Sequence, residues 1–307
     1  MPTRIALMGC GTWGRHILRD LRFLDCEVSV VARSDASVAR ATEGGAAQVV
    51  PTLGELGPVD GIVIATPEPA HAAHVRAALS MGVPVFCEKP LTVDPSSALQ
   101  LAREAPDRLF VMDKWRYHPG VEGLRDVARS GELGGVVGLR CVRLGWGSAH
   151  PTSDSTWHLL VHDLAISIEI LGKLAEPVSA VGEVVDGQIH GIRGHLGSDP
   201  WVSVEVSSAH AERRRELSLI CEGGVAWLRS PEATTIEFSR EIGGEIHTRE
   251  VGADMPLLRE LRAFTEHLEG GPPPRSSAAE GAAVVAAVGR MRELAGLPSG
   301  SPETDGR

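Results

Sequence analysis

The chain has 307 residues, a hydrophobic content of 43% and a formal net charge of -10, from 30 basic and 40 acidic residues. This length accommodates two packed domains, whereas the acidic balance argues against a nucleic-acid partner, which requires a basic face. No apolar segment approaches the roughly 20 residues of a membrane helix and the first residues show no apolar leader, so we expect a cytoplasmic protein that does not bind membranes.

Five cysteines are scattered along the chain and form no Cys-x-x-Cys pair. Their odd number and irregular spacing argue against a disulfide framework or a thiolate zinc site. A reducing compartment fits this pattern.

A glycine-rich loop lies between a β-favouring run at 4–8 and a helical pattern at 15–23. Gly9 permits a tight turn, Gly11 lets the backbone approach a pyrophosphate, and Gly14 lets helix and strand pack closely. The pyrophosphate then meets the N-terminus of the helix. In this context the loop is predicted to bind a dinucleotide through Gly9, Gly11, Thr12, Trp13 and Gly14.

The end of the second strand-like run, 27–32, bears on the choice of cofactor. An acidic residue here would bind the ribose 2′-hydroxyl of NAD, whereas the pair Arg33 and Ser34 suits the 2′-phosphate of NADP. We expect NADP(H) to be preferred, with NAD(H) as the alternative because Asp35 follows closely.

Strands at 60–65, 83–88 and 109–112 alternate with helices at 71–81 and 94–105. This order predicts a parallel, doubly wound Rossmann sheet, in which ligands bind at the carboxyl ends of the strands. Several chemically distinctive residues fall at those ends and are expected to converge on one crevice: Gly9, Thr66, Lys89 and Asp113.

Lys89 is one of only three lysines, with Lys114 and Lys173, in a chain that otherwise uses arginine. A partly desolvated lysine exchanges a proton near neutral pH and arginine does not. Lys89 is therefore a candidate acid/base, the alternative being an exposed lysine at a strand end.

Beyond residue 120 the pattern changes to strand-like runs, followed by helices at 256–268 and 276–294. The strands are expected at 136–144, 178–185, 201–208, 215–221, 225–229 and 234–238. We expect a dinucleotide-binding domain at 1–118, a second domain at 119–297 and a disordered tail at 298–307.

A helix predicted at 157–171 carries His158 and His162 four residues apart, next to an apolar stripe. One histidine or both could act in catalysis. They could also ligate a metal, although no third ligand is evident and we predict no metal, or they could be structural.

The chain resembles the glucose-fructose oxidoreductase / inositol dehydrogenase (Gfo/Idh/MocA) family over residues 4–172. The resemblance rests on the following motifs: Gly9-Cys10-Gly11-Thr12-Trp13-Gly14, Ala65-Thr66-Pro67 with His71, Glu88-Lys89-Pro90, Arg116-Tyr117-His118-Pro119, Ser130-Gly131-Glu132-Leu133-Gly134 and 157–163. The glycine loop and the Arg-Tyr-His-Pro motif look most like the branch that acts on nucleotide sugars, often at the 3-hydroxyl.

The resemblance implies an NAD(P)-dependent oxidoreductase acting on a ring hydroxyl or ketone of a sugar, sugar nucleotide or cyclitol. It implies an α+β second domain with an open, mostly antiparallel sheet that often forms a homodimer or homotetramer interface. It further implies that residues at or after the ends of the strands 60–65 and 83–88 contact the cofactor. These residues are Thr66, Pro67, His71, Glu88 and Lys89.

The resemblance also implies that His162 and Lys89 handle the proton of the reacting carbinol. In the family the helix carries Asp-x-x-x-His-Asp; His162 and Asp163 match its last two residues, but His158 replaces the first aspartate. Lys89 would then lack one electrostatic partner, which Glu88 could replace.

Five residues are candidates for substrate contacts, with packing as their alternative role: Arg116, Tyr117, His118, Trp146 and Trp157. The run 213–215 of three arginines could attract an anionic substrate or form a solvated strand end. Two other functions remain open on the same scaffold: reduction of an imine or enone, and a non-catalytic NAD(P)-binding sensor.

Overall fold

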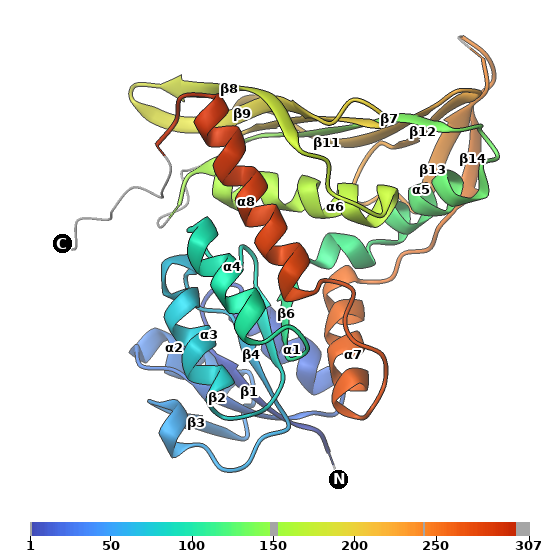
Figure 1. The fold of residues 1–307 in the computed structure, drawn as a ribbon. Coiled ribbons are helices and arrows are strands. Elements are labelled where there is room, and N and C mark those ends of the chain that lie inside the picture. Colours follow the sequence, from blue (N-terminus) through green and yellow to red (C-terminus); the bar gives the residue numbers. More distant parts are fainter. Residues whose placement is uncertain (1, 148–152, 242, 299–307) are drawn as a thin grey trace. The chain divides into compact units, whose positions relative to one another are not determined.

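The computed structural model describes residues 2–147, 153–241 and 243–298 (Figure 1). The chain forms two compact units, Met1–Lys114 with Met255–Ala282, and Trp115–Asp254 with Ala283–Arg307. This division differs from the expected single boundary at residue 118, because the chain returns to the first unit after residue 254. Of the tail expected at 298–307, residues 299–307 lie outside the described part.

The first unit contains a parallel sheet with the strand order β3-β2-β1-β4-β5-β6. Its strands are β1 (Arg4–Met8), β2 (Glu27–Val31), β3 (Gln48–Val50), β4 (Gly61–Ile64), β5 (Val85–Glu88) and β6 (Leu109–Met112). This is the order of a dinucleotide-binding Rossmann sheet, so the expected fold is confirmed. Strands β1, β4, β5 and β6 are almost fully buried, as expected for a sheet covered on both faces.

The helices of the first unit follow the strands in alternation. They are α1 (Gly14–Phe23), α2 (Asp35–Glu43), α3 (His71–Leu79), α4 (Pro95–Glu104) and α7 (Pro256–Leu268), with short 3-10 turns at Leu53–Glu55 and Glu68–Ala70. The side chains of Ser34 and Asp94 cap α2 and α4 by accepting hydrogen bonds from the backbone N–H groups of Ser37 and Ser97.

Helix α7 joins the first unit because its apolar face completes that unit's core. Leu261 and Phe264 are fully buried, and the Phe264 ring stacks on Phe86 of β5 with a centroid distance of 4.9 Å. The expected second domain, 119–297, included this helix, whereas α7 belongs to the first unit.

The second unit is built on a sheet with the order β14-β13-β12-β11-β7-β10-β9-β8, antiparallel except where β7 pairs with β10. Its strands are β7 (Val136–Trp146), β8 (Pro177–Val185), β9 (Gln188–Leu196), β10 (Trp201–Ser207), β11 (Ala209–Cys221), β12 (Gly224–Leu228), β13 (Thr235–Ser239) and β14 (His247–Glu250). Helices α5 (Pro119–Ser130) and α6 (Val161–Leu171) lie along one face of it, as Figure 1 shows. The predicted open, mostly antiparallel sheet is therefore confirmed.

The helix expected at 157–171 begins as a π-helical turn, η4 (Thr156–Leu160), and only then becomes α6. Arg292 of α8 (Ala278–Leu294) is fully buried and clamps the start of this turn by donating hydrogen bonds to the Asp154 carboxylate at 2.7 and 2.9 Å and to the Thr156 hydroxyl. Asp154 also accepts the Thr156 N–H at 2.9 Å. Wide turns of this kind are frequent at functional sites. None of the described helices is long and apolar enough to cross a membrane.

We predict that Phe264→Ala lowers the free energy of unfolding by about 3–5 kcal/mol, because it leaves a cavity against Phe86. Urea denaturation measures this loss. The control is Arg262→Ala on the exposed side of α7, which should change stability by less than about 0.5 kcal/mol. A Phe264→Ala loss as small as the control's would show that α7 is not part of the first unit's core.

Candidate functional site

The glycine loop between β1 and α1 leaves open backbone where a cofactor pyrophosphate would lie. Gly9 has φ +92, and a methyl group there would lie 2.9 Å from the Ala65 carbonyl oxygen; at Gly14 it would lie 2.3 Å from the Gly9 carbonyl oxygen. At Gly11, by contrast, a methyl group would meet no atom within 4 Å. The first and last glycines are thus required by packing, and the middle one leaves room for a ligand, so the loop fits NAD(P).

Trp13 connects this loop to the end of β5. Its indole N–H donates to Oε1 of Glu88, while Oε2 of Glu88 accepts the backbone N–H of Lys89 at 3.0 Å. The Lys114 ammonium lies 4.4 Å from the centroid of the Trp13 ring, a cation–π contact. Glu88 is therefore held by both oxygens, between the cofactor loop and the candidate acid/base.

Burial and charge act in opposite directions on Lys89. Burial lowers the pKa of Lys89, and Lys114 adds to this, whereas the carboxylates of Glu88, Asp113 and Glu68 raise it; the net direction is downward. The ammonium therefore releases its proton more readily than a solvated lysine does. This is the state that proton exchange near neutral pH requires.

His71 joins the loops that follow β4 and β5. It is 1% exposed, and its ring nitrogens lie 2.7 Å from the Pro90 carbonyl oxygen and 2.8 Å from that of Thr66. Burial lowers the pKa of His71, against the effect of these two carbonyl groups. His71 thus supports the segment after Lys89, and its expected contact with the cofactor stays a prediction, as do those of Thr66, Pro67 and Glu88.

Arg33 and Ser34 lie just after the end of β2, beyond Ala32, and are exposed. Ser34 uses its hydroxyl to cap α2, as described above. His74 of α3 hydrogen-bonds through Nδ1 to the Thr66 hydroxyl at 2.9 Å, and its pKa is lowered by burial and by the charge of Arg33. Arg33 therefore lies near the residues that follow β4, where it remains a candidate for a cofactor phosphate.

In the second unit, α6 is anchored to the sheet by a buried ion pair. Arg143 of β7 donates to the Asp163 carboxylate through Nη2 at 2.7 Å and Nε at 3.1 and 3.2 Å, and the two side chains are 4% and 1% exposed. The Arg143 guanidinium lies 4.6 Å from the centroid of the Trp115 ring, and the His162 ring lies 6.4 Å from that centroid. His162 is thus held beside Trp115, on a helix fixed by its neighbour Asp163.

Sequence reasoning missed Trp115 and Arg143. A signal was present, because Arg143 occupies the same face of β7 as the buried Cys141, where an uncompensated arginine is unexpected.

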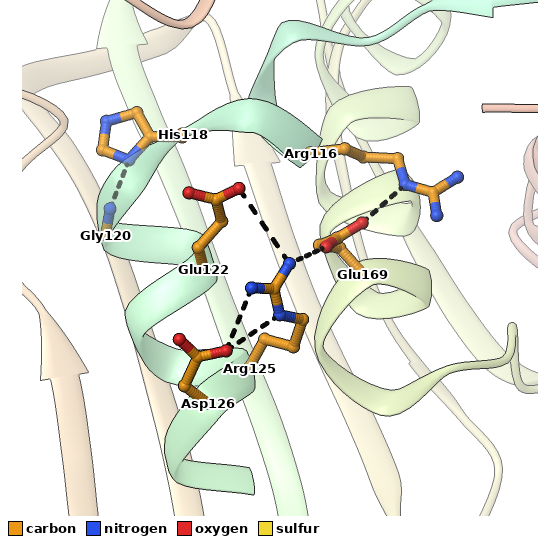
Figure 2. A network of polar contacts seen from close by, with 7 residues as sticks. All are labelled: Arg116, His118, Gly120, Glu122, Arg125, Asp126 and Glu169. Carbon is orange, nitrogen blue, oxygen red and sulfur yellow. Dashed lines mark hydrogen bonds and ion pairs between the residues drawn. The ribbon is translucent and has the colours of Figure 1, made fainter. Parts of the chain in front are cut away.

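Arg116, Tyr117 and His118 are all buried, and Figure 2 shows the polar contacts of Arg116 and His118 in the second unit. Arg116 donates to Glu169 of α6 at 3.0 Å, and the other oxygen of Glu169 accepts from Arg125 of α5 at 2.6 Å. His118 accepts the Gly120 N–H through Nδ1 at 3.0 Å and donates through Nε2 to the Pro231 carbonyl oxygen at 2.9 Å. Their contacts with a substrate stay predictions.

The remaining candidates differ in exposure. Trp157 is fully buried, whereas Trp146 at the end of β7 is 79% exposed. His158 and His162 are partly exposed, the first in the π-helical turn and the second in α6. Within the described ranges, no three His, Cys, Asp or Glu side chains form a group suited to hold a metal ion.

Comparison with known proteins identifies the family. A model described as an oxidoreductase family with an NAD-binding Rossmann fold matches residues 3–111. An inositol 2-dehydrogenase of Mycolicibacterium smegmatis is 30% identical over 249 residues, which cover 73% of this chain and 71% of that protein. The chain belongs to the Gfo/Idh/MocA oxidoreductase family. The family resemblance and the enzyme class are thereby confirmed, and an inositol 2-dehydrogenase of Rhodococcus erythropolis, 28% identical over 84% of this chain and 74% of its own, agrees.

Solved structures share the family fold over almost the whole chain. A UDP-N-acetylglucosamine 3-dehydrogenase from Acidithiobacillus ferrooxidans has a TM-score of 0.83 at 22% identity and covers 96% of this chain and 98% of its own. A 3-ketoreductase from Actinomadura kijaniata in complex with TDP-benzene and NADP has a TM-score of 0.81 at 21% identity, covering 95% and 97%. At such identities the similarity establishes the fold alone.

Glu260 of α7 is a buried carboxyl group in the first unit that the family motifs do not include. It is 1% exposed, and neither of its oxygens has a hydrogen-bond partner among the described residues. Burial raises the pKa of Glu260 well above its usual value, the charges of Glu88 and Asp113 raise it further, and Lys114 lowers it. Glu260 therefore holds its proton more tightly than a solvated carboxyl group does.

We predict that Glu260→Gln flattens the pH dependence of stability. In the wild type, the folded state keeps the Glu260 proton at pH values above roughly 4.3, where the unfolded chain releases it. The free energy of unfolding therefore falls by up to about 1.4 kcal/mol per pH unit until the folded-state pKa is reached. Urea unfolding from about pH 5 to about pH 8 should show this fall in the wild type and in Glu266→Gln, the exposed control on α7, and a smaller fall in Glu260→Gln, because burial also raises the pKa of Glu88. Parallel curves for all three proteins would contradict it.

Proposed function

We propose that this family member transfers a hydride between NAD(P) and a ring hydroxyl or ketone of a sugar, sugar nucleotide or cyclitol, with Lys89 and His162 handling the proton. The observation that carries the proposal is the partly buried Lys89 ammonium at the carboxyl end of β5, with its pKa lowered by burial. When bound, the nicotinamide supplies or accepts the hydride.

During reduction one proton would move from His162 to the substrate oxygen, assisted by the Lys89 ammonium, and during oxidation it would return to His162. Glu88, Asp113 and Glu68 offset part of the cost of burying the ammonium, so both protonation states are accessible. Trp13 and the Lys89 backbone hold the two oxygens of Glu88 in place beside Lys89.

Asp163 would position His162 for this proton transfer. Because Arg143 engages both Asp163 oxygens, Asp163 serves to anchor the helix and is not an available base. His158 stands where the family has aspartate, so the imidazole of His158 would replace a fixed negative charge with a group that can itself exchange a proton.

The relatives suggest the substrate class. The relatives in sequence are named inositol 2-dehydrogenases, and the solved structures include a UDP-N-acetylglucosamine 3-dehydrogenase and a 3-ketoreductase. All three names describe redox chemistry at one ring carbon. We extend that chemistry to this chain.

Assembly as a homodimer or homotetramer through the second unit's sheet is part of the same proposal. The edge strand β8 exposes Val178 and Val181 at 61% and 72% of their surface. A second copy of the chain would cover such apolar side chains. Light scattering measures the assembly.

We predict that Lys89→Met and His162→Ala each lower kcat by about 100-fold to 10,000-fold, because each removes a proton-transfer group. Cofactor affinity, followed by tryptophan fluorescence, should change far less. Turnover is measured with NAD(P) and a panel of cyclitols and nucleotide sugars. Lys173→Met, at an exposed lysine, is the matched control and should behave as the wild type. Normal turnover in both site variants would refute the assignment.

For the cofactor, we propose NADP(H) over NAD(H). Arg33→Ala should weaken NADP(H) binding by about tenfold to a hundredfold, since it removes a charge-assisted hydrogen bond, and should leave NAD(H) binding nearly unchanged. Arg22→Ala, on the exposed end of α1, is the control. Tighter binding of NAD(H) than NADP(H) by the wild type would overturn the preference.

A further inference from the structure

The three arginines of the run 213–215 on β11 have different surroundings. Arg213 is 65% exposed and pairs with Glu232, and Arg214 is 48% exposed and pairs with Glu216. Arg215 is partly buried. The run is therefore not a uniform solvated strand end.

Arg215 lies directly opposite Arg143 in the β7–β11 ladder. Residues opposite one another in an antiparallel pair share a face of the sheet, so Arg215 lies on the face where Arg143 contacts α6. The register of β11 shifts between Ala209 and Arg214, immediately before this pair. Such irregularities redirect side chains and are frequent beside active sites.

One hydrogen-bond donor of this pair has no acceptor among the described residues. Both oxygens of Asp163 are engaged by Arg143, while the Arg215 Nε–H is buried and has no hydrogen-bond acceptor among the described residues. Burial lowers the pKa of Arg215, and the charges of Arg143 and Arg213 add to this, against Asp163 and Glu232. A buried donor without an acceptor and two like charges side by side both cost stability, and a bound anion would relieve both.

This cationic pair lies near the proposed proton group. The Arg143 guanidinium and the His162 ring both lie against the ring of Trp115, at 4.6 and 6.4 Å from its centroid. A ligand held by Arg215 would thus have its charged group close to α6.

We propose that Arg215, beside Arg143, binds a negatively charged oxygen group of the substrate, a phosphoryl or a carboxylate. This inference rests on the proposed function and narrows it, because it selects a charged sugar derivative over a neutral cyclitol. Arg143 is already committed to Asp163, so Arg215 supplies the specificity.

The first test uses the wild type with oxidised cofactor at saturation, so that the cofactor's own phosphate-binding groups are occupied. UDP and glucuronate should bind and raise the Tm, and inositol at the same concentration should raise it less. Sodium chloride at matched ionic strength is the control for screening. If inositol binds and neither anion does, the proposal is wrong.

The second test compares Arg215→Met with Arg214→Met on the same strand. Arg215→Met should weaken the binding of UDP or glucuronate, measured by calorimetry, by about tenfold to a hundredfold, and Arg214→Met by less than about twofold. Without ligand, the Tm of Arg215→Met should equal or exceed that of the wild type, since a like-charge contact is removed. Arg215→Lys, which keeps the charge, should retain part of the affinity.

Two outcomes of the second test would overturn the proposal. The first is that Arg215→Met binds the anions as tightly as the wild type does. The second is that the Tm of Arg215→Met without ligand lies well below that of the wild type, which would identify Arg215 as structural. Hydride transfer reports separately on the proposed function. If the wild type and Arg215→Met oxidise inositol equally and neither binds an anion, the proposed oxidoreductase function stands and the anion site is refuted. If anions bind through Arg215 but no hydride transfer is detected, the anion site stands and the oxidoreductase function is refuted.

Discussion

Burial of the Lys89 ammonium, offset by the charges of Glu88, Asp113 and Glu68, is the constraint on which the chemistry proposed for the first unit depends. Removing a charge from water costs several kcal/mol, and the neighbouring carboxylates offset this only while they stay in place. Glu88 is held by Trp13 from the glycine loop and by the Lys89 backbone. The cofactor loop and the candidate acid/base are therefore coupled through one carboxylate.

The second unit uses the same principle to fix α6. Asp163 is held by Arg143, and Glu169, two turns further along the helix, is held by Arg116 and Arg125. These buried ion pairs fix the position of α6 but add little net stability, since the cost of desolvation cancels much of their attraction. His162 is thereby carried by a helix anchored near both ends, which would suit the proton transfer proposed for it, since that step requires one orientation.

Much of the fold could be predicted from local sequence. The glycine loop, the parallel strands and the strand ends at Thr66 and Lys89 follow from patterns that hold in any Rossmann sheet, and the structure confirms them. Strand β9 was missed because it contains two glycines, which normally weaken a strand. They are required here: a methyl group would lie 2.1 Å from the Val206 carbonyl oxygen at Gly191 and 2.5 Å from that of Ser179 at Gly194.

Features created by distant parts of the chain could not be predicted. The return of α7 to the first core, the π-helical turn clamped by Arg292 and the contact of Arg143 with Trp115 all join residues far apart in sequence. Periodicity describes which face of an element is apolar and not which partner covers it. The roles of Lys89 and His162 remain predictions of chemistry, because each residue belongs to a different unit.

The most direct measurement of the central claim is a double-variant cycle on kcat with Lys89→Met, His162→Ala and the combined variant. Groups that move one proton in one transition state act as a unit, so the combined loss should be close to the larger single loss. Losses that multiply in the combined variant would instead mean that the ammonium and the imidazole act independently, and would contradict the account.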